Sequence, residues 1–275
     1  MRTELSRPPS TGEGSVFDRL RFVMVRPSHA GNVGAAARAI KTMGFHRLIV
    51  VSPRTADVGL VPEARAFASG ATDVLDDMGV TDTLAEALAG CTLAFALTAR
   101  PRDLGPPACD IRTAARASRE HVIAHPHGEI AMVLGTERAG LANEDVALCN
   151  RICHIPANPD YSSLNVAQAA QLVAWEMRYA FIEEGWAGLL PDTGGHSRFG
   201  DEPAGNDKVQ ALLAHWEEAL VALRFLDPAH PKKLMPRMRH LLVRTALSND
   251  EVDMLRGVCT AMIAAARQRA PLPDK

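Results

Sequence analysis

The chain has 275 residues, a formal net charge of −2 at pH 7 and a pI of about 6.6, which suits one sizeable domain with an appendage. Because the net charge is close to zero, the protein as a whole does not attract nucleic acid electrostatically. Any nucleic-acid binding must therefore come from a local basic patch. Basic residues outnumber acidic ones between residues 1 and 54, which marks one candidate patch and is equally typical of a solvated face.

Cysteine, histidine and hydropathy patterns exclude several other classes. The five cysteines have no disulfide or metal-site spacing, so we expect reduced thiols and a cytoplasmic protein. His121, His125 and His127 have no carboxylate spaced for a metal site, and no bound metal is expected. Apolar runs are too short to span a bilayer and no signal peptide is evident, so no membrane association is expected.

The first two thirds of the chain predict alternating strands and helices. Residues 1–18 are rich in Ser, Pro, Gly and Thr and predict a disordered tail. Apolar runs predict strands at 20–26, 48–52, 91–98, 130–134 and 151–155. Helices are predicted at 32–43, 63–68, 84–89 and 111–123, and a short one from residue 143. A further long helix is predicted to follow the polar turn that starts at residue 158, and to end at residue 182. We therefore expect an α/β domain over residues 19–184, with a parallel sheet covered by helices on both faces.

The sequence changes character after residue 184. Residues 185–207 contain Gly, Pro, Asp and Glu with little apolar content, which predicts a linker. Residues 208–275 predict a small helical extension, with amphipathic helices at 209–225, 232–245 and 251–269. The middle helix concentrates basic residues, which is typical of phosphate contact and equally of a solvated face. They are Lys232, Lys233, Arg237, Arg239 and Arg244.

The helix that ends at Ile182 has an unusually polar entrance. Ser162, Ser163 and Asn165 are candidate caps just before its apolar stripe. A helix N-terminus presents unpaired N–H groups and a positive dipole end, which suits a polar or anionic ligand. A well-capped core helix explains the same residues, so this stretch alone leaves both interpretations open.

Four loops that follow predicted strands carry polar or basic residues. Ligands of open parallel sheets bind at the carboxyl ends of strands. The loops read S-H-A-G-N-V-G, T-A-R-P-R, G-T-E-R-A-G-L and I-P-A-N-P-D-Y-S-S-L-N. A nicotinamide-dependent oxidoreductase would require G-x-G-x-x-G after the first strand, and Gly31 and Gly34 do not have that spacing.

Three segments resemble the motifs of the SPOUT superfamily of RNA methyltransferases. They are N-V-G-A-A-A-R-A-I-K-T-M-G-F, L-G-T-E-R-A-G-L-A-N-E and I-P-A-N-P-D-Y-S-S-L-N-V-A-Q-A. With H-L-L-V-R-T-A-L-S-N-D-E-V-D-M-L-R-G near the C-terminus, the chain resembles the TrmJ-type branch of tRNA ribose 2′-O-methyltransferases. The resemblance implies a deep trefoil knot, a homodimer that completes its active site across the interface, and S-adenosylmethionine as methyl donor.

The resemblance also implies roles for individual residues. The donor pocket is expected to contain Thr98, Leu134, Gly135, Glu137, Gly140, Ile155, Ser163, Leu164 and Asn165. Catalysis is expected to involve Arg38, Asn32, Ser163 and Asn165, and RNA contact to involve Arg38, Arg100, Arg102 and Arg138. Because a guanidinium group stays protonated at neutral pH, we expect Arg38 to orient phosphate and stabilise the developing alkoxide. Thr136 stands where relatives often carry a basic residue.

The sequence thus predicts an enzyme that methylates a ribose 2′-hydroxyl of tRNA, at the cytidine or uridine that opens the anticodon loop. A ribosomal RNA 2′-O-methyltransferase is the alternative within this class. A non-catalytic RNA-binding protein of the same fold is the alternative outside it, and a failure to bind the methyl donor would favour that interpretation.

Overall fold

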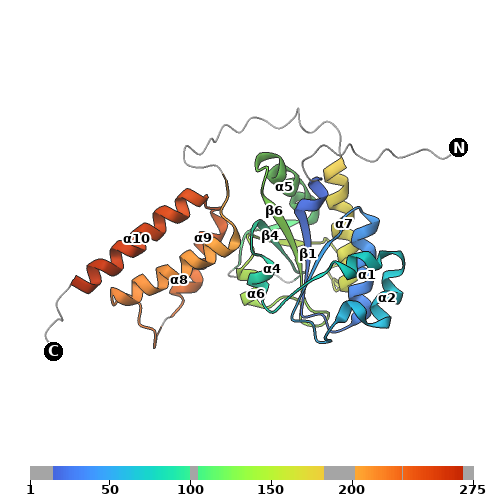
Figure 1. Ribbon diagram of the computed structural model, residues 1–275, viewed down its shortest axis with the longest axis horizontal. Helices are drawn as coiled ribbons and strands as arrows, with labels where there is room; N and C mark the ends of the chain where they lie inside the picture. The colour runs from blue at the N-terminus through green and yellow to red at the C-terminus, as the bar shows by residue number, and fades with distance from the viewer. Residues whose placement is uncertain (1–14, 100–104, 183–201, 231, 269–275) are drawn as a thin grey trace.

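The computed structural model describes residues 15–99, 105–182, 202–230 and 232–268. These residues form a sheet domain and a separate group of C-terminal helices (Figure 1). In the sheet domain, strands alternate with helices along the chain, and all paired strands are parallel. The predicted α/β class with a parallel sheet is confirmed. The trefoil knot that the family resemblance implies stays a prediction.

Seven strands form the sheet, in the order β3-β2-β1-β6-β4-β7-β5. Their bounds are β1 Leu20–Val25, β2 Arg47–Val51, β3 Gly79–Thr81, β4 Cys91–Leu97, β5 Ala108–Asp110, β6 Glu129–Leu134 and β7 Arg151–His154. The five predicted strands are present. The sequence does not reveal β3 and β5, because each has three residues, none of them buried, and neither shows an apolar run.

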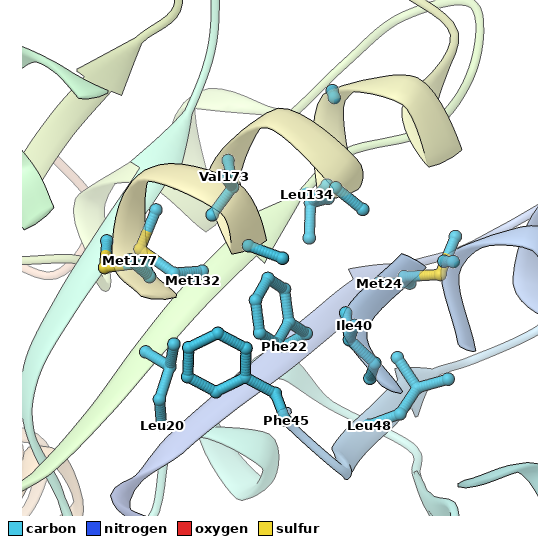
Figure 2. Packing of buried hydrophobic residues seen from close by; sticks show 14 of the residues in the cluster. Leu20, Phe22, Met24, Ile40, Phe45, Leu48, Met132, Leu134, Val173 and Met177 are labelled. Atoms are coloured by element: carbon cyan, nitrogen blue, oxygen red, sulfur yellow. The ribbon is translucent and has the colours of Figure 1, made fainter. Parts of the chain in front are cut away.

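Helices cover both faces of the sheet (Figure 1). One face carries α1 (Ala30–Thr42), α2 (Pro62–Ala68), α3 (Thr72–Asp76), α5 (Ile111–Ala124) and α7 (Val166–Ile182), and the other carries α4 (Leu84–Ala87) and α6 (Asn143–Ala147). Side chains of β1 alternate between the two cores, with Phe22 and Met24 on the first face and Val23 and Val25 on the second. Figure 2 shows Phe22 and the neighbouring ring of Phe45 among aliphatic side chains of the first core.

Helix α7 buries the stripe of small and apolar residues that the sequence predicts. The buried residues of this stripe are Val166, Ala169, Ala170, Val173, Met177, Ala180 and Phe181, and Ala167 and Ala174 are buried beside them. This face packs against α1 and α5. The helix begins at Val166, so residues 158–165 form a turn at its entrance.

The predicted N-terminal tail is too long at its C-terminal end. Val16–Arg19 form a short 3-10 helix, capped by the Ser15 hydroxyl. The ring of Phe17 lies 5.1 Å from the ring of Phe45 and 5.8 Å from that of Phe181, measured between centroids. Residues 15–18 therefore belong to the sheet domain, and residues 1–14 lie outside the described residues.

Three C-terminal helices surround a core of their own, as predicted. They are α8 (Asn206–Ala222), α9 (Leu234–Arg244) and α10 (Asn249–Gln268). The predicted linker of residues 185–207 ends too late, because Ala204 is buried in this core and α8 begins at Asn206. Hydrogen bonds from Asn150 to the carbonyl of Val243 (3.0 Å) and from Asn206 to that of Leu148 (2.7 Å) join the two parts. Within the described ranges, no helix has the length and apolar character needed to cross a membrane.

Helices α1 and α2 approach each other closely at Gly34. A Cβ on Gly34 would lie 1.9 Å from the carbonyl oxygen of Ala64. We expect Gly34→Ala to lower the free energy of unfolding by roughly 1–3 kcal/mol, because the backbone of α2 must move. Urea denaturation measures this change. Gly70→Ala is the control, since a Cβ there would meet no atom within 4 Å. Equal losses in the two variants would contradict the close approach.

Candidate active site

Three loops run from the carboxyl ends of strands to the parts of the chain that carry the motifs. The loop after β1 leads into α1, the loop after β6 spans residues 135–141, and the loop after β7 leads into α7. Because Met24 of β1 pairs with Leu134 of β6 in a parallel register, the first two loops start side by side.

The carboxylate of Glu137 joins the β6 loop to the start of α1. It accepts hydrogen bonds from the backbone N–H and the hydroxyl of Ser28 (3.1 and 2.7 Å), the N–H of His29 (3.2 Å) and Nδ2 of Asn32 (3.1 Å). The N-cap residue of α1, His29, makes no side-chain cap, and Glu137 binds the backbone N–H groups of Ser28 and His29 just before the first turn of the helix. Burial raises the pKa of Glu137, but the hydrogen bonds from Ser28 and Asn32 outweigh burial and lower this pKa to about 2.

Asn32 extends this network to the entrance of α7. Its Nδ2 donates to Glu137, and its Oδ1 accepts a hydrogen bond from Nδ2 of Asn165 (3.0 Å). Asn165 caps α7, since its Oδ1 accepts from the N–H groups of Ala167 (2.9 Å) and Gln168 (3.3 Å). Three residues that the motifs single out, Glu137, Asn32 and Asn165, thus form one hydrogen-bonded chain between three loops.

The loop of residues 135–141 is closed on itself. Two backbone hydrogen bonds join Thr136 and Gly140 (3.1 and 3.0 Å). A Cβ on Gly135 would lie 2.2 Å from the carbonyl carbon of Gly140, and Gly140 has a φ of 68°, so both positions require glycine. The hydroxyl of Thr136 accepts a hydrogen bond from the N–H of Ala139 (3.1 Å), so this side chain helps to close the loop.

The other residues predicted for the donor pocket lie around this network at different depths. Leu134 is buried, Ile155 is half-buried and Leu164 is 37% exposed. The N–H of Thr98 donates to the carbonyl of Cys153 (3.0 Å), which fixes the end of β4 beside β7. Ser163 is exposed in the turn before α7.

The predicted arginines lie outside the hydrogen-bonded network. Arg38 is exposed on α1, about 9 Å further along the helix axis than Asn32 at a rise of 1.5 Å per residue. Its guanidinium group has no hydrogen-bond or ion-pair partner in the part of the chain that the structure describes. Arg138 is exposed in the β6 loop. Arg100 and Arg102 lie outside the described residues.

Sequence patterns do not single out two contacts of this site. Ser28 holds Glu137, and its place just before a helix start is the one signal that suggests a capping role. Arg26 directly follows β1, has a φ of 48° and forms an ion pair with Asp145, which is buried in α6. This pair ties the exit of the β6 loop to β1. The sequence shows only a charged residue after an apolar strand, and this pattern does not predict which residue pairs with it.

A small cavity lies away from these loops. It is located between the sheet domain and the C-terminal helices, and Cys91, Asn206 and Leu242 are among its lining residues. None of the predicted site residues lines it. Within the described ranges, no group of three or more His, Cys, Asp or Glu side chains is placed to hold a metal ion.

The sequence matches two protein-family models. Residues 19–175 match the SpoU rRNA methylase family. The chain belongs to this family. Residues 207–271 match the C-terminal domain of the tRNA methyltransferase TrmJ, which confirms the resemblance to the TrmJ-type branch.

Individual relatives cover most of the chain. The tRNA (cytidine/uridine/adenosine-2′-O-)-methyltransferase TrmJ of Pseudomonas aeruginosa strain UCBPP-PA14 is 41% identical over 92% of this chain and 96% of its own length. The crystal structure of TrmJ from Z. mobilis ZM4 has a TM-score of 0.73 at 33% identity, and covers 88% of this chain and 98% of that one. A probable methyltransferase from Bordetella pertussis Tohama I is 65% identical, with a TM-score of 0.58, over 61% of this chain and 98% of that one. The SpoU family member described here is therefore a methyltransferase with a TrmJ-type helical extension.

We expect Glu137 to stabilise the fold in a pH-dependent way. Folding lowers the pKa of Glu137 from its ordinary 4.5 to about 2, so its contribution is complete above about pH 4.5 and disappears as the pH falls towards 2. Glu137→Gln should lower the free energy of unfolding at pH 7 by roughly 1.5–3 kcal/mol, the size of hydrogen bonds to a charged group. Urea denaturation between pH 7 and pH 2 should show the difference from wild type shrinking below about pH 4.5.

Glu120→Gln is the control for this experiment, because Glu120 is exposed on α5. Its stability should follow the wild type at every pH. A loss in Glu137→Gln that stays constant down to pH 2 would show that the carboxylate charge does not hold the loops.

Proposed function

We propose that this protein transfers a methyl group from S-adenosylmethionine to a ribose 2′-hydroxyl of tRNA, at the cytidine or uridine that opens the anticodon loop. The chain of hydrogen bonds through Glu137, Asn32 and Asn165 carries the proposal, because it joins all three motif loops. The names of curated relatives, among them the Pseudomonas aeruginosa TrmJ, describe tRNA 2′-O-methylation.

The surroundings of the β6 loop fit an adenosine-containing donor. The half-buried Ile155 and the 37% exposed Leu164 offer apolar surface, Leu134 is buried beneath the loop, and Thr98 follows the neighbouring strand β4. A Cβ on Gly140 would meet no atom within 4 Å, so the space over this glycine is open to a ligand. Pockets of this kind combine apolar walls with a few fixed polar groups. When bound, the donor supplies a methyl group already activated on a sulfonium, and the protein's task is to align it.

We assign the alignment to the hydrogen-bonded chain. Asn32 and Asn165 use their amide groups on each other, on Glu137 and on the first N–H groups of α7. These residues therefore position the loops, while Ser163 is exposed in the turn and is available to the donor or the ribose. Fixed loops favour transfer, because methyl and hydroxyl must meet in line.

Arg38 is our choice for the residue that handles the RNA. Its guanidinium group is exposed and has no partner in the described part of the chain, so it is available to a phosphate. A guanidinium group stays charged at neutral pH, which suits it to stabilising a developing alkoxide and not to accepting a proton. We propose the exposed Arg138 as a second phosphate contact, and propose Arg100 and Arg102 for the same role from the sequence alone.

An apolar stripe on α7 supports a homodimer. Leu172, Trp175, Tyr179 and Ile182 recur at three- and four-residue spacing and are 40, 54, 58 and 50% exposed. Contiguous exposed apolar surface of this kind marks protein–protein contact. We propose that the same stripe of a second copy covers it. A tRNA substrate and the five free cysteines support a cytoplasmic location.

A ribosomal RNA substrate is the second candidate, because the family model that matches residues 19–175 is described as an rRNA methylase family. The TrmJ C-terminal domain over residues 207–271 favours tRNA.

We expect wild-type protein to transfer labelled methyl groups from S-adenosylmethionine to tRNA, and Arg38→Ala to lower kcat by about 10²–10³-fold, as for other lost charge stabilisers. Affinity for the donor, measured by calorimetry, should not change, because Arg38 lies away from the donor loops. Arg65→Ala, which removes an exposed ion pair with Asp76, is the control and should retain activity.

Three results of this assay would contradict the proposal in different ways. Full methyl transfer by Arg38→Ala would show that this arginine does not have the proposed role. Methyl transfer to ribosomal RNA but not to tRNA would show that ribosomal RNA is the substrate. Absence of donor binding by the wild type favours a non-catalytic RNA-binding protein.

We expect Trp175→Glu to dissociate the homodimer, because it places a charge in the middle of the α7 stripe. Sedimentation velocity should then show a monomer, and methyl transfer should fall with dimer content. Val80→Glu is the control, since Val80 is 57% exposed on the edge strand β3, at the far end of the sheet from β7. A dimer that survives Trp175→Glu places the interface elsewhere.

A further inference from the structure

Tyr161 has no evident role in the fold. Its side chain is 77% exposed, more than any other large apolar or aromatic side chain in the described part of the chain. Within the same residues, its ring forms no aromatic pair and its hydroxyl group forms no hydrogen bond. Single exposed apolar residues are common on protein surfaces, so exposure alone does not indicate a function. The location of the ring in the structure is the evidence that matters.

The backbone below Tyr161 is fixed. The side-chain oxygen of Asn158 accepts a hydrogen bond from the N–H of Asp160 (3.0 Å), and its carbonyl accepts one from the N–H of Tyr161 (3.0 Å). These two bonds make an Asx turn inside a β-turn, with Pro159 at the position that favours it. Four residues later, Asn165 is bound to α7 and to Asn32. The ring therefore stands on a turn anchored at both ends, next to the candidate active site.

The neighbours of Tyr161 favour RNA over a second copy of the chain. Asn158, Asp160, Ser162 and Ser163 are all exposed, so the ring stands among polar groups. A protein interface needs a contiguous apolar centre, which the α7 stripe offers and this turn does not. A single flat ring among hydrogen-bonding groups suits an unstacked base of a single-stranded RNA loop, because such bases stack on aromatic side chains.

We propose that Tyr161 is the platform on which a base of the tRNA anticodon loop stacks while the neighbouring ribose is methylated. The proposal rests on the proposed function, since it identifies how the same site holds its RNA. Stacking tolerates any base, because every base has a π face. Tyr161 therefore holds the loop open at the site without selecting the base.

The test compares Tyr161→Ala, Tyr161→Phe and Tyr161→Trp in steady-state methylation of tRNA. Loss of one stacked base costs about 1–3 kcal/mol, so Tyr161→Ala should raise the KM for tRNA roughly 5- to 150-fold. The Phe and Trp variants keep a ring and should retain a KM within about threefold of wild type. Affinity for S-adenosylmethionine and the oligomeric state should not change. Phe225→Ala removes another highly exposed ring (70%), located after α8, and is the control.

A second measurement identifies the base. Abasic nucleotides are placed one at a time through the anticodon loop, and affinity is measured with wild type and with Tyr161→Ala. At the stacked position, the abasic tRNA should bind wild type more weakly than intact tRNA does. Tyr161→Ala should bind the abasic and the intact tRNA equally well, so the two changes are coupled in a double-mutant cycle.

Each other outcome overturns the proposal. An unchanged KM for tRNA in Tyr161→Ala, or additive losses at every abasic position, shows that no base stacks there. A weaker affinity for S-adenosylmethionine places the ring in the donor pocket, and a monomeric Tyr161→Ala places it in the dimer interface. Wild-type protein that methylates no tRNA refutes the proposed function itself, whereas active wild type with an indifferent Tyr161→Ala refutes only this inference.

Discussion

The arrangement of the candidate site depends on one partly buried negative charge. The carboxylate of Glu137 is held by neutral donors: the N–H groups of Ser28 and His29, the Ser28 hydroxyl and the amide of Asn32. It also lies at the N-terminus of α1, where the helix dipole favours an anion. Removing a charge from water is costly, and several fixed donors offset that cost only when all are in place. The loops of β1 and β6 are therefore held in one arrangement.

Packing places the donors where this charge needs them. Helices α1 and α7 both follow parallel strands, so both begin at the same edge of the sheet. Helix α7 packs against α1 through a face rich in buried alanines, and Gly34 on α1 lets α2 lie close to α1. The two helix entrances are then close enough for Asn32 to bond Asn165. Core packing thus sets the geometry of the polar network.

The sequence is sufficient to predict the fold class, but not the contacts that the motif residues make. Apolar runs reveal five strands, while β3 and β5 are too short and too exposed to show a pattern. The motifs point to Glu137 and Asn165 as groups for the donor, yet the structure shows protein partners for both. Glu137 meets Ser28 across 109 positions of the chain. Such pairs depend on loop conformations, and no periodicity encodes them.

The structure also shows why the basic bias of the N-terminal region overstates its capacity for RNA. Arg19 donates to the carbonyls of Val122 (2.8 Å) and Gly128 (2.9 Å) around the end of α5, where it acts as a C-cap. Arg21 and Arg47 both bind Glu129. These guanidinium groups hold the amino-terminal side of the sheet together and are not available to phosphate.

Arg38 differs from them because it lies on the exposed side of α1 without a partner in the described residues. A chain with a formal net charge of −2 can thus bind RNA only where cations are left unpaired, and burial and pairing decide which ones those are.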